Sequence, residues 1–304
     1  MTVKKIKLLV LSGPTGSGKS ELAVRLAEGI GGEIINADSM QVYCGMDIGT
    51  AKPPAELLAR VPHHLLGIVS PEQNFTASNF RREAATAIAD IDGRGKKAIV
   101  VGGTGLYIRA LLEGLVDSPT GDPEFRLQFA EVPGEELLRR LFLVDPESAS
   151  RLHANDRVRL VRALEVFSQT GRPISAFRSE HAFSGRYYDT LKMAIRVERQ
   201  ELYRRIDSRV EQMLRDGLVP EVGSLLASGY ASNLKAMRSI GYKEIVAYLA
   251  GETTLDEAVS LIKRDTRRYA KRQMTWFCKE NDINWLEYPE SFANILAHVI
   301  QFFG

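Results

Sequence analysis

One stretch near the start of the chain has the residue types and spacing of a phosphate-binding loop. It consists of Gly13, Pro14, Thr15, Gly16, Ser17, Gly18, Lys19 and Ser20. This order fits the pattern G-x-x-x-x-G-K-[ST], in which backbone N–H groups surround phosphate oxygens and the lysine adds a full positive charge. The final serine hydroxyl is a Mg²⁺ ligand in such loops. We therefore predict that this loop binds a polyphosphate or diphosphate, with Ser20 as the metal ligand.

The residues on either side of the loop have the patterns of a buried strand and an amphipathic helix. Residues 6–11 form a short apolar run, and residues 21–30 place Leu22, Leu26 and Ile30 on one helical face. A loop between a strand and a helix also receives the partial positive charge of the helix N-terminus. This context favours phosphate binding over a glycine turn with a solvated lysine.

The remaining pattern alternates apolar strands with amphipathic helices, which is typical of a parallel sheet wrapped by helices. Further strands are expected at 33–37, 98–101, 192–197 and 283–286, and helices at 76–91, 157–170, 199–215, 219–228, 241–250 and 255–279. We predict an α/β fold, namely a P-loop NTPase-like parallel sheet flanked by helices, with a small all-helical insertion domain.

Turn-forming residues between 116 and 125 mark a boundary within the chain. From there to about residue 190, the pattern shows helices and turns but no convincing strand. The expected catalytic core therefore comprises residues 1–116 and 191–304, and residues 117–190 form the helical insertion.

The bulk composition is that of an ordinary globular protein. Of the 304 residues, 44% are hydrophobic and 26% are charged, and the net charge of +2 neither favours nor opposes a nucleic-acid partner. The two cysteines, Cys44 and Cys278, fit neither a disulfide framework nor a zinc site. With no apolar run of membrane-spanning length and no signal-peptide pattern, we expect a cytoplasmic protein without a membrane partner.

Two polar residues follow predicted strands at the edge of the sheet where ligands bind. Asp38 comes just after the strand at 33–37, and Thr104 comes after the strand at 98–101. Because the carboxyl ends of parallel strands share one edge, both should face the phosphate loop. The residues alone leave open whether Asp38 has a chemical role or is a turn aspartate, and whether Thr104 is only a turn residue.

Longer motifs elsewhere are more specific than the phosphate loop. They are 38–43, 45–53, 62–65, 80–82, 102–107, 155–156, 162–166, 170–171, 239–244 and 271–277. Through these motifs the chain resembles the tRNA dimethylallyltransferases, also called tRNA isopentenyltransferases, over residues 8–290. The resemblance implies transfer of a dimethylallyl group from dimethylallyl diphosphate to N6 of the adenosine 3′ of the anticodon. The implied acceptors are tRNAs that read codons beginning with U, diphosphate is released, Mg²⁺ is the cofactor and ATP is not required.

The resemblance also implies roles for individual residues. Asp38 accepts a proton from the adenine amine, and Thr104 holds the same adenine. Lys19 and Arg209 stabilise the departing diphosphate. Without the resemblance, a surface ion pair on an amphipathic helix is the favoured interpretation of Arg209.

The implied partner is the anticodon stem-loop of tRNA. The matching positions are Asp38, Ser39, Met40, Gln41, Thr104, Arg126, Val158, Arg159, Leu160, Val161, Arg162, Arg238, Ser239, Ile240, Gly241, Tyr242, Lys243, Lys271 and Arg272. The last two close a segment, 263–272, in which six cations stand against Asp265 alone. Such a run is commonly just a solvated helix face, and with the resemblance it becomes a candidate for tRNA phosphate contacts.

Three other functions are compatible with parts of the pattern. A P-loop nucleotide kinase would use the same loop, but it leaves the basic segment unexplained. An adenylate isopentenyltransferase would share the active site without needing an RNA-facing surface. A non-catalytic RNA-binding protein would not need Lys19, Asp38 and Thr104. We expect a monomer, because the implied mechanism needs no two-fold contact.

Overall fold

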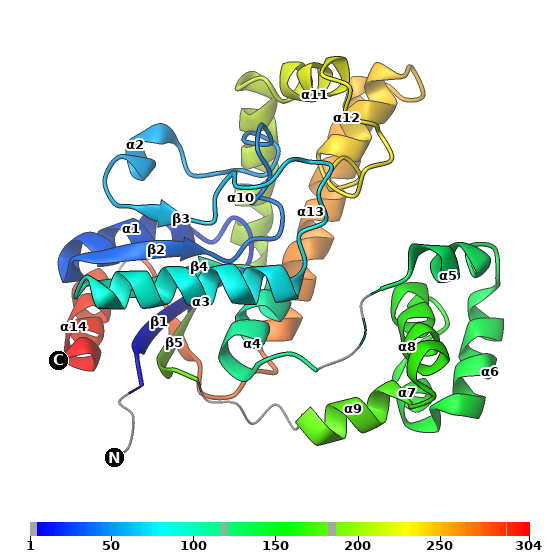
Figure 1. Ribbon diagram of the computed structural model, residues 1–304. Helices are drawn as coiled ribbons and strands as arrows, with labels where there is room; N and C mark the ends of the chain where they lie inside the picture. Colours follow the sequence, from blue (N-terminus) through cyan, green and yellow to red (C-terminus); the bar gives the residue numbers. More distant parts are fainter. Residues whose placement is uncertain (1–4, 117–118, 120, 182–186, 290) are drawn as a thin grey trace. The chain divides into compact units, whose positions relative to one another are not determined.

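The computed structural model describes residues 5–116, 119, 121–181, 187–289 and 291–304. These residues form a six-stranded, all-parallel sheet with the strand order β3-β2-β4-β1-β5-β6 (Figure 1). The strands are β1 (Lys7–Ser12), β2 (Gly32–Asn36), β3 (His63–His64), β4 (Lys97–Gly102), β5 (Asp189–Ile195) and β6 (Asn284–Leu286). The predicted α/β fold with a parallel sheet is confirmed.

Helices account for most of the remaining described residues. They are α1 (Lys19–Ile30), α2 (Ala55–Leu58), α3 (Ala77–Gly93), α4 (Gly105–Glu113), α5 (Pro123–Gln128), α6 (Gly134–Val144), α7 (Pro146–Arg151), α8 (Arg157–Thr170), α9 (Ile174–His181), α10 (Arg199–Arg215), α11 (Leu218–Ala227), α12 (Tyr242–Leu249), α13 (Leu255–Phe277) and α14 (Phe292–Phe303). The helices predicted at 157–170 and 199–215 have the observed bounds of α8 and α10.

Strand β5 and helix α14 differ from the prediction, and β3, α2 and α4 were not predicted either. Strand β5 was expected at 192–197 but begins at Asp189 and ends at Ile195, because it follows β1 in register from the Lys7–Asp189 pair onward. Helix α14 was not predicted, although Phe292, Ile295 and Val299 have helical spacing. It packs on the core through Ile295 and Val299, which are buried.

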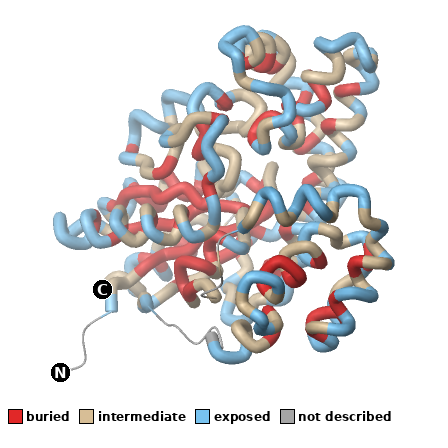
Figure 2. The backbone as a smooth tube through the Cα atoms, turned by 45° about the vertical axis from the view of Figure 1, so that its right-hand side comes forward, coloured by how far each residue is buried: buried red, intermediate tan, exposed pale blue. Residues whose placement is uncertain are grey.

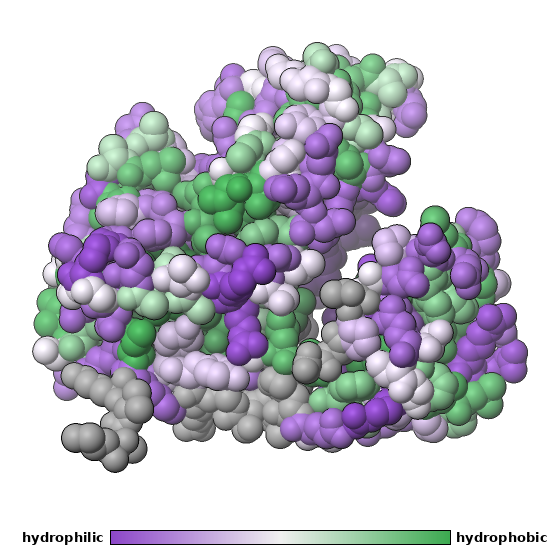
Figure 3. All heavy atoms as spheres, viewed as in Figure 1, coloured by the Kyte–Doolittle hydropathy of each residue, from purple (hydrophilic) through white to green (hydrophobic). Residues whose placement is uncertain are grey.

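The sheet has a buried core on each face, and Figure 2 shows its strands as almost continuously buried. Along β1, Leu9 and Leu11 join the core beneath α1 and α14, whereas Leu8 and Val10 join the core beneath α3. This alternation explains why the strands read as unbroken apolar runs. The outer side of α3 carries hydrophilic residues, as Figure 3 shows.

The chain divides into two compact units, one of residues 1–112 with 186–304 and one of residues 113–185. The second unit has its own core, built mainly from α6 and α8 around Leu137, Leu141 and Leu160. Its described residues form helices without a strand. None of the helices in the described part of the chain combines the length and hydropathy of a membrane span.

The loops that follow β1, β2 and β4 meet at the carboxyl edge of the sheet. The phosphate loop follows β1, and Gly16 and Gly18 adopt φ values of 81° and 87°, which glycine tolerates best. The Ala37 N–H donates to Val101 O at 2.7 Å, and the Thr104 N–H donates to Ala37 O at 3.2 Å. These backbone bonds fix the loop after β2 against the turn after β4.

Candidate active site

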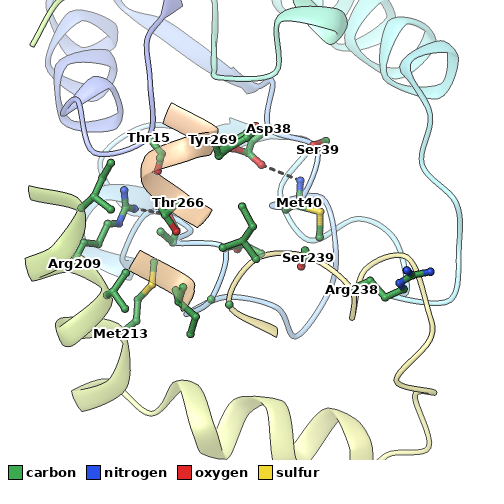
Figure 4. A pocket seen from close by; sticks show the side chains of 18 residues that line it. Thr15, Asp38, Ser39, Met40, Arg209, Met213, Arg238, Ser239, Thr266 and Tyr269 are labelled. Atoms are coloured by element: carbon green, nitrogen blue, oxygen red, sulfur yellow. Dashed lines mark hydrogen bonds between the residues drawn. The ribbon is translucent and has the colours of Figure 1, made fainter. Parts of the chain in front are cut away.

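A cavity of about 330 Å³ opens beside the phosphate loop in the first unit (Figure 4). Its polar lining includes Thr15 from the phosphate loop, Asp38 from the loop after β2, and Arg209 from α10. The remaining lining residues are Ser39, Met40, Gly49, Thr50, Ala51, Ile206, Val210, Met213, Arg238, Ser239, Ile240, Gly241, Ile262, Thr266 and Tyr269. The ionic groups of Asp38, Arg209 and Arg238 thus line a largely apolar cavity.

Asp38 is held by the backbone through one carboxylate oxygen. Its Oδ1 accepts hydrogen bonds from the N–H groups of Met40 at 2.9 Å and Gln41 at 3.4 Å. No described residue donates a hydrogen bond to Oδ2. Asp38 is therefore a turn aspartate, as one of the two sequence interpretations proposed, and its second oxygen remains available to a ligand.

Thr104 lies next to Asp38 but is not among the residues that line the cavity. Its Oγ1 accepts a hydrogen bond from the Ser39 N–H at 3.1 Å, which ties the Asp38 loop to the β4–α4 turn. Tyr269 of α13 contacts Thr104, and burial together with the Asp38 charge raises the pKa of the Tyr269 hydroxyl. The structure thus places Thr104 and Asp38 together, with Tyr269 between Thr104 and the cavity.

Two half-buried cations, Lys19 and Arg209, lie near Asp38. Burial lowers the pKa of the Lys19 ammonium to about 8; the Asp38 carboxylate opposes this shift and the Arg209 guanidinium adds to it. Lys19 Nζ donates to Pro14 O at 3.3 Å, and Arg209 Nη2 donates to Ala51 O at 3.1 Å. Arg209 is half-buried, lines the cavity and forms no salt bridge with a described carboxylate, so a surface ion pair does not describe it. Two cations near one carboxylate leave an excess positive charge for an anion.

The N-terminus of α1 is open for an anion as well. Gly18 precedes the helix in a left-handed conformation, and no side chain of the described residues caps it. The first N–H groups of a helix have no partner within the helix, so those of Lys19 and Ser20 are available. The Thr15 N–H differs, because it donates to Gln273 Oε1 at 2.9 Å. Within the predicted phosphate loop, the Thr15 N–H therefore already has a partner.

Residues 41–280 match the family model described as IPP transferase. The chain belongs to the IPP transferase family. This finding confirms the family resemblance derived from the motifs, and it covers the Asp38–Tyr43 motif from Gln41 onward as well as the whole of α10 and α13.

Relatives in the IPP transferase family match over almost the full length. A protein of Citrifermentans bemidjiense named tRNA dimethylallyltransferase 1 is 79% identical over 98% of this chain and 98% of its own. A tRNA dimethylallyltransferase of Geobacter sulfurreducens is 58% identical over 99% of this chain and 98% of its own.

Solved structures agree with this assignment to the IPP transferase family. The tRNA isopentenylpyrophosphate transferase of Bacillus halodurans superposes with a TM-score of 0.74 at 36% identity, over 98% of this chain and 97% of its own. A eukaryotic dimethylallyltransferase acting on tRNA gives a TM-score of 0.79 at 32% identity, over 93% of this chain and 74% of its own. The P-loop-containing fold is therefore shared across distant members.

Several of the residues predicted to bind tRNA line the cavity. Ser39, Met40, Arg238, Ser239, Ile240 and Gly241 line it together with Asp38. Gln41 lies beside it and donates from Nε2 to Thr50 O and Ala51 O, both at 3.0 Å. Lys243 is half exposed and pairs with Asp265 at 3.4 Å. The segments at 38–41 and 238–241 thus form neighbouring parts of one wall.

Tyr242 and Leu160 are placed differently from the prediction. The Tyr242 side chain is fully buried, and its hydroxyl donates to Glu221 Oε1 at 2.6 Å. The Leu160 side chain is fully buried in the core of the second unit. Their apolar bulk stabilises the two units from inside, so neither side chain is a tRNA contact. The sequence pattern could not separate them from exposed neighbours in the same motifs.

The other predicted residues of the second unit differ in how free they are. Val158 is 82% exposed, whereas Val161 is half-buried. Arg159 is exposed and pairs with Asp156 at 3.3 Å. Arg126 and Arg162 both bind the buried Glu165, at 2.9 and 2.5 Å. These two arginines neutralise a buried carboxylate, and burial would otherwise raise its pKa.

The basic segment on α13 separates into paired and unpaired cations. Lys263 pairs with Glu211 at 2.7 Å, and Arg267 pairs with Asp207 at 2.9 Å. Arg264 and Arg268 both contact Asp265. Lys271 and Arg272 are exposed and have no acidic partner among the described residues. Within this segment, Lys271 and Arg272 are therefore the cations whose charge no described carboxylate offsets, and they are available to an external phosphate.

Sequence reasoning missed three residues that organise the site. Tyr269 and Gln273 lie one helical turn apart on the inner side of α13, where Ile262 and Thr266 also line the cavity. Glu221 accepts hydrogen bonds from the N–H groups of residues 47–49 and from the Tyr242 hydroxyl. The spacing of 262, 266, 269 and 273 was the available signal, but the cations between them concealed it.

Proposed function

We propose that this protein transfers a dimethylallyl group from dimethylallyl diphosphate to N6 of the adenosine 3′ of the anticodon in tRNAs that read U-initial codons. One observation carries the proposal: a carboxylate with a free oxygen lies near two half-buried cations at a cavity whose wall includes residues 238–241. Family membership supports the same reaction, because the full-length relatives are named for it.

Asp38 is the proposed proton acceptor. The exocyclic amine of adenine is a weak nucleophile until its proton is taken up in the transition state. The backbone bonds to Oδ1 orient the carboxylate, so Oδ2 can accept the proton while N6 attacks C1 of the donor. Tyr269 lines the cavity near this carboxylate, and Thr104 contacts Tyr269 and the Asp38 loop, so these two hydroxyl groups are the proposed holders of the adenine edge.

The leaving group is stabilised by positive charge that is already in place. As the bond from C1 to the diphosphate oxygen breaks, negative charge grows on the diphosphate, and Lys19, Arg209 and the open N-terminus of α1 face that charge. Partial burial of the two cations strengthens their effect, since it reduces screening by water.

The apolar part of the cavity suits the prenyl group. Ile206, Val210 and Met213 come from α10 beside Arg209, and Ile262 comes from α13 opposite them. A small branched hydrocarbon there is shielded from water, which would otherwise compete with the adenine amine as acceptor.

Mg²⁺ is the proposed cofactor. The described residues contain no cluster of three His, Cys, Asp or Glu that could hold a metal by protein ligands alone. Mg²⁺ typically takes only one or two protein oxygens and otherwise binds substrate phosphates and water, so the half-buried Ser20 hydroxyl at the start of α1 fits it. When bound, the ion would supply further charge neutralisation for the leaving diphosphate.

The anticodon stem-loop is the proposed macromolecular partner. Lys271, Arg272 and Arg238 are exposed cations in the first unit, and Val158 and Arg159 are the exposed candidates in the helical unit of residues 113–185. Every residue of the proposed chemistry belongs to one chain, so we propose a monomer, which acts in the cytoplasm with its tRNA substrate.

The test is a transfer assay with labelled dimethylallyl diphosphate and Mg²⁺ but no ATP, in which unmodified tRNA and AMP are offered separately. We expect label in tRNA alone, at the adenosine 3′ of the anticodon. A tRNA with guanosine at that position is the matched control and should stay unlabelled.

Two results would contradict the proposal. Label in AMP but not in tRNA would make the protein an adenylate isopentenyltransferase. Label in neither acceptor, with tRNA still bound, would favour the non-catalytic RNA-binding function.

A further inference from the structure

One buried side chain of α13 connects two loops that follow different strands. Gln273 is 5% exposed. Its Oε1 accepts the hydrogen bond from the Thr15 N–H at 2.9 Å, and its Nε2 donates to Gly103 O at 3.0 Å. Thr15 belongs to the phosphate loop after β1, and Gly103 belongs to the turn after β4. A single amide therefore joins both.

The contact is tightly fitted. A Cβ atom added to Gly103 would lie 2.1 Å from Gln273 Nε2, so the amide reaches the turn only because residue 103 is glycine. Both polar atoms of the amide are bonded to backbone groups, whose loss of a partner is costly when buried, and the Tyr269 hydroxyl also contacts the amide. Neither Asn nor Glu reproduces this bond pair, since one is shorter and the other has no donor when ionised.

The two connected loops serve opposite halves of the proposed reaction. The phosphate loop faces the diphosphate of the donor, whereas the turn carries Thr104, which bonds to the Asp38 loop on the acceptor side. Their separation sets the distance between the attacked carbon and the attacking nitrogen. A displacement of about 1 Å between reacting groups is enough to cost roughly a hundredfold in rate.

We propose that Gln273 is a positioning residue that fixes the phosphate loop against the β4–α4 turn and thereby sets the donor–acceptor distance. The inference rests on the proposed function for its acceptor half. Gln273 acts through Thr15 and Gly103 and touches neither substrate. The neighbouring Lys271 and Arg272 point to solvent from the same helix, so α13 contributes to the site through Gln273 and to the surface through that pair.

The test uses Gln273→Met, which keeps the side-chain volume but removes both hydrogen bonds, in the full-length protein. We expect the single-turnover rate constant for transfer to preformed enzyme–tRNA complex to fall by roughly 10- to 100-fold. The affinity for tRNA should stay within about twofold, while binding of inorganic pyrophosphate should weaken about tenfold because the loop is less ordered. Gln301→Met, at an exposed position of α14, is the matched control and should change none of these values.

Gly103→Ala is the second variant, because its Cβ displaces the amide without altering Gln273. It should reproduce the pyrophosphate and rate effects. Unchanged pyrophosphate binding in Gln273→Met would overturn the inference, as would an equal loss of tRNA affinity, pyrophosphate affinity and thermal stability. If the wild-type protein does not prenylate tRNA, the proposed function fails, yet the pyrophosphate measurement still tests whether Gln273 orders the phosphate loop.

Discussion

At the scale of single residues, the proposed base Asp38 and the two cations near it differ in how they are hydrogen-bonded. Asp38 is fixed through one oxygen and leaves the other free, whereas Lys19 and Arg209 are half-buried and bonded to carbonyl oxygens. Such carbonyl contacts can be exchanged for an anionic ligand at little cost, because the new bonds join full charges. The site is thus arranged to bind an anion.

Replacing Asp38 tests the proposed base. Asp38→Asn preserves the oxygen that accepts from Met40 but removes the proton acceptor, so kcat should fall by about 10²–10⁴. The affinity for tRNA, measured by filter binding, should change little. Asp92→Asn, on the exposed side of α3, is the control. Wild-type turnover in Asp38→Asn would remove Asp38 from the mechanism.

The lowered pKa of Lys19 predicts how donor binding depends on pH. With a pKa of about 8, Lys19 is charged in the free enzyme below that pH and loses its charge above it. If binding requires the charged form, donor affinity should be about tenfold weaker at pH 9 than at pH 7. Calorimetric titration of the donor measures this. In Lys19→Arg the charge persists, so its affinity should be flat over this range; equal slopes in both proteins would refute the assignment.

At the scale of elements, α13 combines a surface role with an internal one. Its outer side carries Lys271 and Arg272 without acidic partners in the described structure, and its inner side carries Tyr269 and Gln273. Unpaired cations release counterions when they contact nucleic acid, whereas paired ones have already neutralised each other.

Removing the unpaired cations should alter the salt dependence of tRNA binding. For Lys271→Ala with Arg272→Ala, the slope of log affinity against log salt should decrease by about 1.5, since each lost phosphate contact is worth about 0.7–0.9. Lys263→Ala with Arg267→Ala removes the same charge from ion pairs with Glu211 and Asp207 and should change the slope much less. Similar slopes in both variants would show that the segment 263–272 is an ordinary solvated helix surface without specific phosphate contacts.

The elements show what periodicity predicts and what it does not. The strand at 98–101 and the helix at 157–170 were predicted because apolar spacing and a Gly171 stop are local signals. The contact of Gln273 with Thr15 joins residues 258 positions apart, and no local pattern encodes it. Asp38 was located by the edge rule for parallel sheets, but its free oxygen emerged only from the loop geometry.

At the scale of the whole molecule, each of the two units is stabilised by buried residues of its own. The sheet unit buries its strands on both faces, and the unit of residues 113–185 closes around Leu160 and its neighbours. Stability of one unit is therefore expected to vary with little effect on the chemistry of the other.

A core substitution in the second unit tests this independence. Leu160→Ala should destabilise that unit by about 2–5 kcal/mol, because it leaves a cavity at a fully buried position. Scanning calorimetry should show one transition shifted to lower temperature, while pyrophosphate binding stays at the wild-type value. Leu127→Ala, at a position 73% exposed, is the control. A matching loss of pyrophosphate binding would show that the units do not act separately.

The strand order has a consequence for how the protein forms on the ribosome. Strand β1, which carries the phosphate loop, lies between β4 and β5, and about 90 residues separate the end of β4 from the end of β5. At roughly 5–20 residues per second, β1 waits on the order of 5–20 s with one edge unpaired. The helical unit is synthesised during that interval and has a complete core of its own, so it is positioned to fold first, and the sheet that houses the chemistry closes last.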